Sequence, residues 1–177
     1  MKTLIDSLQP FDSRGQLNVI IETPKGSRAK YAYDRETGLM ILSKEMAAGM
    51  VYPFNFGFVP RTLAADGDPL DVLVLNEEPM IAGCLLSVKP IAVIEATQTE
   101  KGKPVRNDRV IGQAIGKEIP LQWQELKLDQ AVAAQIALFF TTYNSLYGKK
   151  FRMLSVGGLQ KARNVIDRAI ELYADKR

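Results

Sequence analysis

The sequence contains no histidine and a single cysteine, Cys84, among its 177 residues. Without imidazoles and with one thiol, the chain cannot build the usual structural zinc sites, a Ser-His-Asp triad or a Cys-His nucleophile. A lone cysteine also cannot form an internal disulfide, and we expect Cys84 to serve packing. Any chemistry must therefore use carboxylates, Lys, Arg, Tyr and metals that prefer oxygen ligands.

Long apolar runs are also missing from the sequence. No stretch of roughly 18 apolar residues is present to span a membrane, and residues 1–6 are too short and too soon charged for a signal peptide. We therefore expect a soluble, cytoplasmic protein with no membrane partner. The net charge of +3 is too small to indicate a nucleic-acid partner, because the Lys and Arg residues are scattered along the chain.

An apolar content of 46% over 177 residues is enough for one buried core and rather little for two. We expect a single domain over residues 1–177. Apolar and β-branched runs between turn residues predict strands at 17–22, 30–33, 39–44, 52–59, 71–75, 84–97 with a break at Pro90, and 109–115. Many short strands of this kind predict a small barrel.

The last third of the chain follows a helical period instead. Asp129 is a candidate N-cap, apolar residues recur every three or four positions after it, and Gly148 is placed to end the helix. A second amphipathic helix is predicted over 159–173. The fold class is therefore α+β, mainly β, with two C-terminal helices packed on a barrel. Residues 1–16 show no period, and we expect them to wrap the surface or a neighbouring subunit.

The most informative stretch is residues 66–71, Asp-Gly-Asp-Pro-Leu-Asp. Asp66, Asp68 and Asp71 crowd the start of a strand, where they repel one another unless water or a hard cation lies among them. Gly67 permits an unusual backbone angle and Pro69 fixes its own, so the turn should be stiff, which suits Mg²⁺. A solvated acidic turn is the alternative interpretation.

This hexapeptide resembles the signature of the family I soluble inorganic pyrophosphatases. Further matches follow in the same order and approximate spacing: Glu22 after Val19-Ile20-Ile21, the pair Lys30-Tyr31, the segment Tyr52-Pro53-Phe54-Asn55-Phe56-Gly57, and Phe139-Phe140 followed by Tyr143. The resemblance covers residue 17 to the C-terminus. It implies an OB-like five-stranded barrel and a homo-oligomer, commonly a hexamer in bacterial-type members.

The resemblance also implies an activity, the Mg²⁺-dependent hydrolysis of inorganic diphosphate to two phosphates by metal-activated water. Asp66 and Asp71 would bind metal, Asp68 would act as general base, and Glu22 would hold a further metal largely through water. Tyr52 would support the catalytic site, and Asn55 would lie near the metals.

Lys30 and Tyr143 match residues that contact phosphate in the family. Tyr143 also lies on the apolar stripe of its helix, so plain core packing is an equally good interpretation.

Several residues depart from the family pattern. Lys44 stands in place of an arginine, so a bidentate fork becomes a point charge in the expected substrate site. The other departures replace acidic, hydroxyl or cationic residues of the family; they are Ala32, Phe56, Gln98, Thr99 and Asn144.

The register of the last metal-binding position is ambiguous. The strict register places Asn107 at the family's metal-binding aspartate and Arg109 at its lysine, which makes Arg109 a candidate substrate-binding residue. A shift of one residue would place Asp108 there as a metal ligand. Lys101, Lys103, Arg106 and Arg109 make this stretch basic, either as a solvated loop or as fixed cations that replace some of the Mg²⁺.

Two other functions stay possible at this point. The chain could be a weakened or inactive homologue that binds another small phosphorylated ligand or serves as an assembly subunit. It could also be an oligonucleotide-binding barrel, although the aspartates would repel a phosphodiester backbone. Phosphate release from Mg-diphosphate separates the first alternative from the enzyme.

Overall fold

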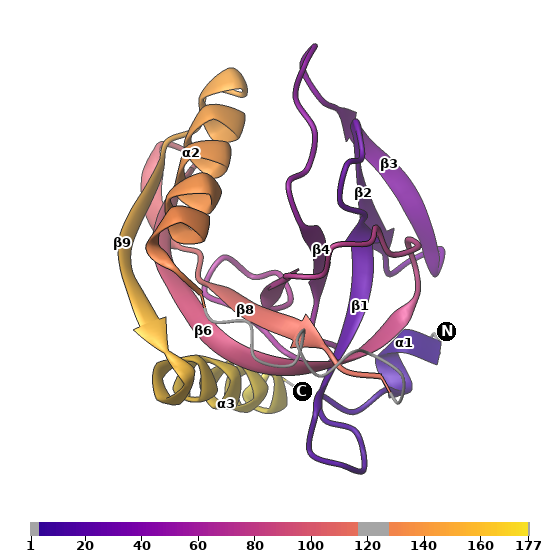
Figure 1. The fold of residues 1–177 in the computed structure, drawn as a ribbon. Helices are drawn as coiled ribbons and strands as arrows, with labels where there is room; N and C mark the ends of the chain where they lie inside the picture. The colour runs from indigo at the N-terminus through magenta and orange to yellow at the C-terminus, as the bar shows by residue number, and fades with distance from the viewer. Residues whose placement is uncertain (1–3, 117–127, 177) are drawn as a thin grey trace.

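The computed structural model describes residues 4–116 and 128–176, which form strands wrapped into a barrel with two long helices (Figure 1). The strands are β1 (Leu17–Thr23), β2 (Ala29–Asp34), β3 (Leu39–Glu45), β4 (Asn55–Phe58), β5 (Asp71–Val74), β6 (Leu85–Glu100), β7 (Lys103–Arg106), β8 (Arg109–Ala114) and β9 (Phe151–Gly158). The helices are α1 (Leu4–Ser7), α2 (Gln130–Leu146) and α3 (Leu159–Asp175).

Five strands close into a ring. β1, β4, β5, β8 and β6 follow one another as hydrogen-bonded neighbours, and β6 pairs again with β1. All of these pairs are antiparallel except β5 and β8, which are parallel. The predicted five-stranded, OB-like barrel is confirmed, and β2 and β3 form a separate hairpin beside it.

β6 is longer and more continuous than the sequence predicts. It extends to Glu100, and Pro90 does not end it but lies at a shift of register against β8. Because proline has no N–H to donate, one ladder bond is lost and the strand bends without stopping. The bend lets β6 pair along its length with β1, β7, β8 and β9.

Two strands, β7 and β9, were not predicted. The basic stretch after Glu100 is a tight hairpin, since Lys101 and Gly102 both have positive φ, 49° and 80°, as a two-residue turn between β6 and β7 requires. β9 pairs with β6, although its sequence is short, polar in part and ends in two glycines. The predicted strand over 52–59 is shorter than expected, because ladder pairing begins only at Asn55.

Both predicted C-terminal helices are present and pack on the barrel. The Asp129 carboxylate accepts from the Val132 N–H at 2.7 Å and caps α2, while Gly148, with φ +68°, follows its end. α2 covers a cluster that includes Leu73 and Phe140, whereas α3 covers another cluster with Val72 and Ile166. Val72 and Leu73 separate this way because successive side chains of a strand face opposite sides.

The N-terminal segment lies against the barrel, as expected. The Asn18 N–H donates to the Pro10 carbonyl at 2.8 Å, and Phe11 forms a bridge with Leu17. Over residues 4–116 and 128–176, none of the helices is both long and apolar enough to cross a membrane.

Candidate functional site

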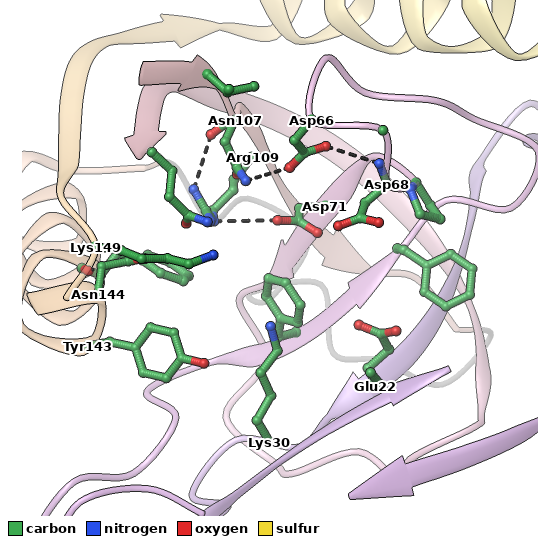
Figure 2. A pocket seen from close by; sticks show the side chains of 18 of the residues that line it. Glu22, Lys30, Asp66, Asp68, Asp71, Asn107, Arg109, Tyr143, Asn144 and Lys149 are labelled. Atoms are coloured by element: carbon green, nitrogen blue, oxygen red, sulfur yellow. Dashed lines mark hydrogen bonds and ion pairs between the residues drawn. The ribbon is translucent and has the colours of Figure 1, made fainter. Parts of the chain in front are cut away.

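The largest group of functional side chains surrounds a cavity of about 990 Å³ beside α2 and the β7 hairpin. Four carboxylates line it: Glu22 from β1, Asp66 and Asp68 from the loop before β5, and Asp71 at the start of β5. Figure 2 shows these carboxylates facing Lys30, Tyr143 and Lys149 across the cavity. The structure therefore brings together residues up to 127 positions apart, Glu22 and Lys149.

The loop with Asp66 and Asp68 is held by its own backbone. Asp66 Oδ1 accepts from the Asp68 N–H at 3.2 Å, and the Asp68 carbonyl accepts from the Ala64 N–H at 2.7 Å. Gly67 has φ +92°, a left-handed conformation that a side chain would strain. The turn has the unusual backbone angle predicted at Gly67, and its stiffness stays a prediction.

Asp71 faces a buried cation. The parallel register of β5 and β8 places Asp71 beside Arg109, and Arg109 Nε lies 3.6 Å from Asp71 Oδ2. The Arg109 guanidinium is 4.0 Å from the ring centroid of Phe140, so it is packed from one side by an aromatic face. Burial raises the pKa of Asp71 to about 7 and lowers that of Arg109, which nevertheless stays charged at neutral pH.

The other two partly buried carboxylates behave like Asp71. Glu22 Oε1 accepts from the Tyr33 N–H at 2.8 Å, yet burial raises the pKa of Glu22 above its ordinary value. Burial also raises the pKa of Asp66. All three carboxyl groups are less easily ionised here than in water, a cost that a bound cation would offset.

The donor set fits a hard divalent cation. Carboxylate oxygens are the ligands that Mg²⁺ prefers, and Mg²⁺ sites commonly use one or two carboxylates with water and substrate phosphates completing the shell. In the described parts of the chain, no group of three Asp, Glu or Cys side chains is gathered closely enough to hold an ion by itself. Asp66, Asp68, Asp71 and Glu22 therefore fit as partial ligands that water and substrate would complete.

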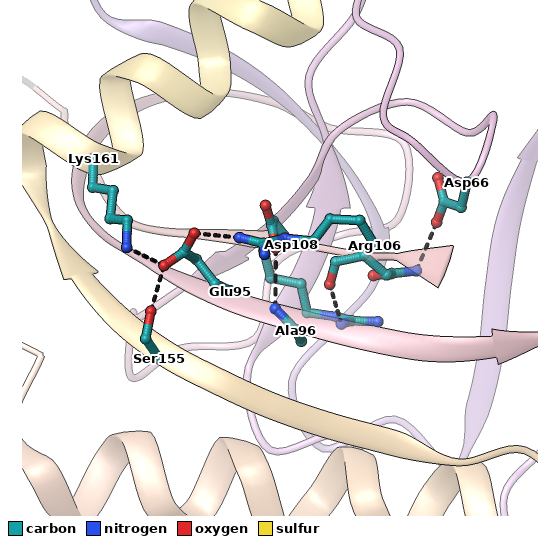
Figure 3. A network of polar contacts seen from close by, with 9 residues as sticks. Asp66, Glu95, Ala96, Arg106, Asp108, Ser155 and Lys161 are labelled. Atoms are coloured by element: carbon teal, nitrogen blue, oxygen red, sulfur yellow. Dashed lines mark hydrogen bonds and ion pairs between the residues drawn. The ribbon is translucent and has the colours of Figure 1, made fainter. Parts of the chain in front are cut away.

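Asn107, and not Asp108, faces this cavity. Asn107 is buried and its Nδ2 donates to Asp66 Oδ2 at 2.6 Å. Asp108 points elsewhere: its Oδ1 accepts from the Ala96 N–H at 3.0 Å and from Arg106 Nε at 2.6 Å (Figure 3). This placement corrects the prediction of Asp108 as a metal ligand in this cavity, because successive residues of an extended chain face opposite sides and Asn107 is the one that faces Asp66.

The basic stretch divides between two sides in the same way. Lys101, Lys103 and Arg109 line the cavity. Arg106 does not, because its guanidinium is paired with Glu95 and Asp108 on the other side. The expectation that all four cations face one ligand is therefore corrected for Arg106.

Lysines and tyrosines form the wall opposite the carboxylates. Lys30 Nζ is 5.4 Å from the Phe56 ring centroid, and Lys44 Nζ is 4.1 Å from that of Tyr147. The Tyr143 ring packs in the α2 core while its hydroxyl points into the cavity (Figure 2). Core packing and a role toward phosphate are thus both compatible with Tyr143, since its ring is buried and its hydroxyl points toward the cavity.

Two buried hydroxyls at this wall carry no hydrogen bond to the described residues. They belong to Tyr52, 1% exposed, and Tyr143, 7% exposed. Burial raises the pKa of Tyr143 to about 12 and that of Tyr52 well above its ordinary value, so both stay protonated donors at neutral pH. An unpaired buried donor is costly, and an anionic ligand would give each one a partner.

Sequence reasoning missed some cavity residues and, besides Asp108 and Arg106, misplaced Asn55. Tyr33, Arg35, Tyr147 and Lys149 line the cavity without having been predicted to do so. Of these four residues, Lys149 is the one whose position the sequence could have indicated, because it directly follows the glycine expected to end α2. Asn55, expected near the metals, lies outside the cavity lining, and its side chain instead bonds the backbone of Lys25, Glu78 and Met80 at 2.8–3.0 Å.

Comparison with known proteins agrees with this geometry. The family model described as inorganic pyrophosphatase matches residues 19–174. An inorganic pyrophosphatase of Methanosarcina acetivorans is 37% identical over 163 residues, which cover 90% of this chain and 93% of that protein. One of Nanoarchaeum equitans is also 37% identical, over 164 residues that cover 89% and 98%.

Solved structures give the same answer at the level of the fold. The inorganic pyrophosphatase of Helicobacter pylori superposes with a TM-score of 0.84 at 28% identity and covers 95% of this chain and 99% of that one. That of Neisseria gonorrhoeae has the same TM-score, 0.84, at 30% identity, with coverage of 96% and 98%. The fold, the acidic turn and these relatives agree, and the chain belongs to the inorganic pyrophosphatase family.

Proposed function

We propose that this chain hydrolyses inorganic diphosphate to two phosphates with the help of Mg²⁺. The observation that carries the proposal is the arrangement of one cavity, in which four carboxylates face lysines and tyrosine hydroxyls, in a chain of the pyrophosphatase family. Diphosphate is a small polyanion, and it would lie between metal ions held by the carboxylates and the cationic wall.

Asp66, Asp71 and Glu22 are the residues that would hold Mg²⁺. When bound, Mg²⁺ would offset the charge of the carboxylates and the substrate and would lower the pKa of nearby water. The partial burial of Asp66, Asp71 and Glu22 leaves their oxygens available to a cation and poorly solvated without one.

Asp68 would accept the proton of the attacking water. Its carboxylate is exposed to the cavity, and its backbone is fixed through the bonds to Asp66 and Ala64. A carboxylate so placed is a suitable general base for water of lowered pKa. Tyr52 would support the opposite wall of the cavity, beside Tyr143, as a buried ring with a protonated hydroxyl.

Lys30, Lys44, Tyr143 and Arg109 would bind the phosphate oxygens. Hydrogen bonds from charged donors to phosphate are shorter and stronger than neutral ones, and the Tyr143 hydroxyl gains the partner it otherwise lacks. Arg109 would act mainly by holding Asp71, because it is 3% exposed and packed against Phe140.

We also propose that the rim of this site is altered. Most of the residues that depart from the family pattern line the cavity, namely Ala32, Phe56, Gln98, Asn107 and Asn144, whereas Thr99 is not among the lining residues. Neutral side chains give Mg²⁺ fewer charged ligands, so we expect weaker metal binding and activity that needs elevated Mg²⁺. Isothermal calorimetry that showed a full set of tightly bound Mg²⁺ at low concentration would contradict this.

Self-association is a further part of the proposal. Leu39, Ile41 and Leu42 of β3 are exposed, which favours a contact with another copy of the chain. We propose a homo-oligomer, a hexamer by resemblance, which light scattering after gel filtration would test. The cytoplasmic location and the absence of a nucleic-acid partner stay predictions.

The decisive experiment measures phosphate release from Mg-diphosphate by the purified chain. We expect turnover that depends on Mg²⁺ and that Asp68→Asn lowers by about 10²–10⁴-fold, the usual contribution of a general base. The matched control is Asp108→Asn, which makes the same change outside the cavity. Wild type that releases no phosphate in the presence of Mg²⁺ would reject the proposed function, and equal rates for wild type and Asp68→Asn would reject the role of Asp68 as general base.

A further inference from the structure

We propose that Lys149, three residues beyond α2, is a substrate-binding residue that contacts the phosphate group farther from the aspartates. This inference rests on the proposed function, because it assigns a role within the same cavity. Figure 2 shows the Lys149 side chain entering the cavity from the wall that carries Tyr143, with its ammonium directed toward the acidic side.

The end of α2 places Lys149 by its backbone geometry. The Lys149 N–H donates to the Asn144 carbonyl at 2.9 Å, and the Gly148 N–H donates to the Ser145 carbonyl at 3.1 Å. Gly148 has φ +68°, the left-handed conformation that reverses the chain at a helix end. The reversal brings Lys149 back over the last turn of α2, beside Tyr143 and Asn144.

Lys149 is the one basic residue in the stretch 130–149, and another cation at this end of α2, Lys44, comes from β3. The last turn of α2 contains no basic residue, and the C-terminal end of a helix carries partial negative charge. Asn144 cannot replace a cation, because it is neutral, 2% exposed, and its Nδ2 donates to the Phe140 carbonyl at 2.8 Å. Lys149 supplies a positive charge from the α2 end itself, where Tyr143 and Tyr147 otherwise present rings and hydroxyls.

The neighbouring lysine provides a natural control. Lys150 is exposed and is not among the cavity lining, and its carbonyl accepts from the Thr99 N–H at 2.9 Å. Lys149 is half-buried and lines the cavity. Two adjacent lysines with opposite orientations therefore separate the effect of one local charge from that of the charge of the whole chain.

The test compares Lys149→Ala, Lys149→Arg and Lys150→Ala with wild type at low ionic strength, where screening is weak. The readouts are KM and kcat for Mg-diphosphate, the dissociation constant of a non-hydrolysable, methylene-bridged diphosphate analogue, and thermal unfolding. We expect Lys149→Ala to raise KM and the analogue's dissociation constant by about tenfold, the lower end of the range for a charged hydrogen bond. Lys149→Arg should keep most of the affinity, and Lys150→Ala should match wild type.

The two proposals fail in different ways. If wild type turns over diphosphate and Lys149→Ala binds the analogue as tightly as Lys150→Ala does, the role of Lys149 is rejected and the proposed function stands. If wild type releases no phosphate, the proposed function is rejected, and binding of the analogue still decides the role of Lys149. An equal loss of affinity in Lys150→Ala would also reject it, because the effect would then be one of overall charge.

Discussion

Two groups of carboxylates in this molecule have pKa values shifted in opposite directions. Around the cavity, Glu22, Asp66 and Asp71 are partly buried near one another, and burial raises the pKa of each. Beside a separate cavity of about 600 Å³, Glu95 accepts from Lys161, Ser155 and Arg106, and these bonds lower its pKa to about 2 (Figure 3). The chain neutralises Glu95 with its own side chains, whereas Arg109 and Lys30 compensate the first group only in part.

This difference in the pKa shifts distinguishes carboxylates placed to bind a ligand from a carboxylate that holds the fold together. A buried carboxylate that the fold leaves incompletely compensated costs stability, and such groups gather where a ligand will bind. Glu95 instead connects elements that are distant in sequence, because Arg106 belongs to β7, Ser155 to β9 and Lys161 to α3. Substitution should therefore mainly change activity in one group and stability in the other.

The largest effect is expected for Asp71→Asn. The substitution would remove a charged metal ligand. Removing a residue that only hydrogen-bonds to such a ligand lowers activity by up to about 100-fold, so loss of the ligand itself should lower phosphate release by more than that. Thermal unfolding should stay near wild type, because asparagine keeps the shape of the side chain and places a polar oxygen beside Arg109.

Asp108→Asn is the control for that variant. Asp108 contacts Arg106 and the Ala96 N–H, outside the cavity, so its loss should leave the rate of phosphate release unchanged. Wild-type activity in Asp71→Asn would contradict the distinction between the two groups of carboxylates. A loss of phosphate release in Asp108→Asn as large as that in Asp71→Asn would contradict it too.

Glu95→Gln should lower the free energy of unfolding by about 1 kcal/mol, since its partners Arg106 and Lys161 are themselves 40% and 51% exposed and their attraction is screened. Urea unfolding checks this value. Diphosphate hydrolysis should be unchanged, because none of these residues lines the acidic cavity. A variant with full stability and impaired hydrolysis would show that the network serves the site directly.

The contribution of Glu95 should also depend on pH with a definite sign. Its pKa is lowered in the folded state from an ordinary 4.5 to about 2, so the stabilisation is complete above pH 4.5 and is lost as the pH falls toward 2. The difference in unfolding free energy between wild type and Glu95→Gln should therefore shrink across this range. Parallel stability curves from pH 6 to pH 2 would contradict the assignment.

The smallest effect is expected for Lys103→Ala. Lys103 is exposed and lines the cavity, so removing its charge should raise KM for diphosphate by about fivefold, equivalent to roughly 1 kcal/mol, at low ionic strength only. Arg106→Ala, three positions later and on the other side of β7, should lower stability with no change in KM. Steady-state kinetics at two salt concentrations would detect a reversal of these roles.

Much of this protein follows from local sequence. The acidic turn at residues 66–71, the Asp129 cap and the glycine after α2 are each specified by a few neighbouring residues, because turns and caps depend on the conformations that Gly, Pro and Asp favour. The spacing of apolar residues likewise indicated the barrel strands, and its change to a helical period indicated both C-terminal helices. The family resemblance rests on these same local patterns.

Tertiary structure alone decided which side each residue of the β7–β8 region faces. A shift of one residue moves every side chain of a strand to the opposite side, and the sequence allowed either Asn107 or Asp108 at the cavity. The hydrogen bonds around Ala96 settle the choice: the Ala96 N–H donates to the Asp108 carboxylate, the Ala96 carbonyl accepts from the Asn107 N–H at 2.9 Å, and the Asn107 side chain faces Asp66. These partners come from strands that meet only in the folded barrel, so no pattern of adjacent residues could have specified them.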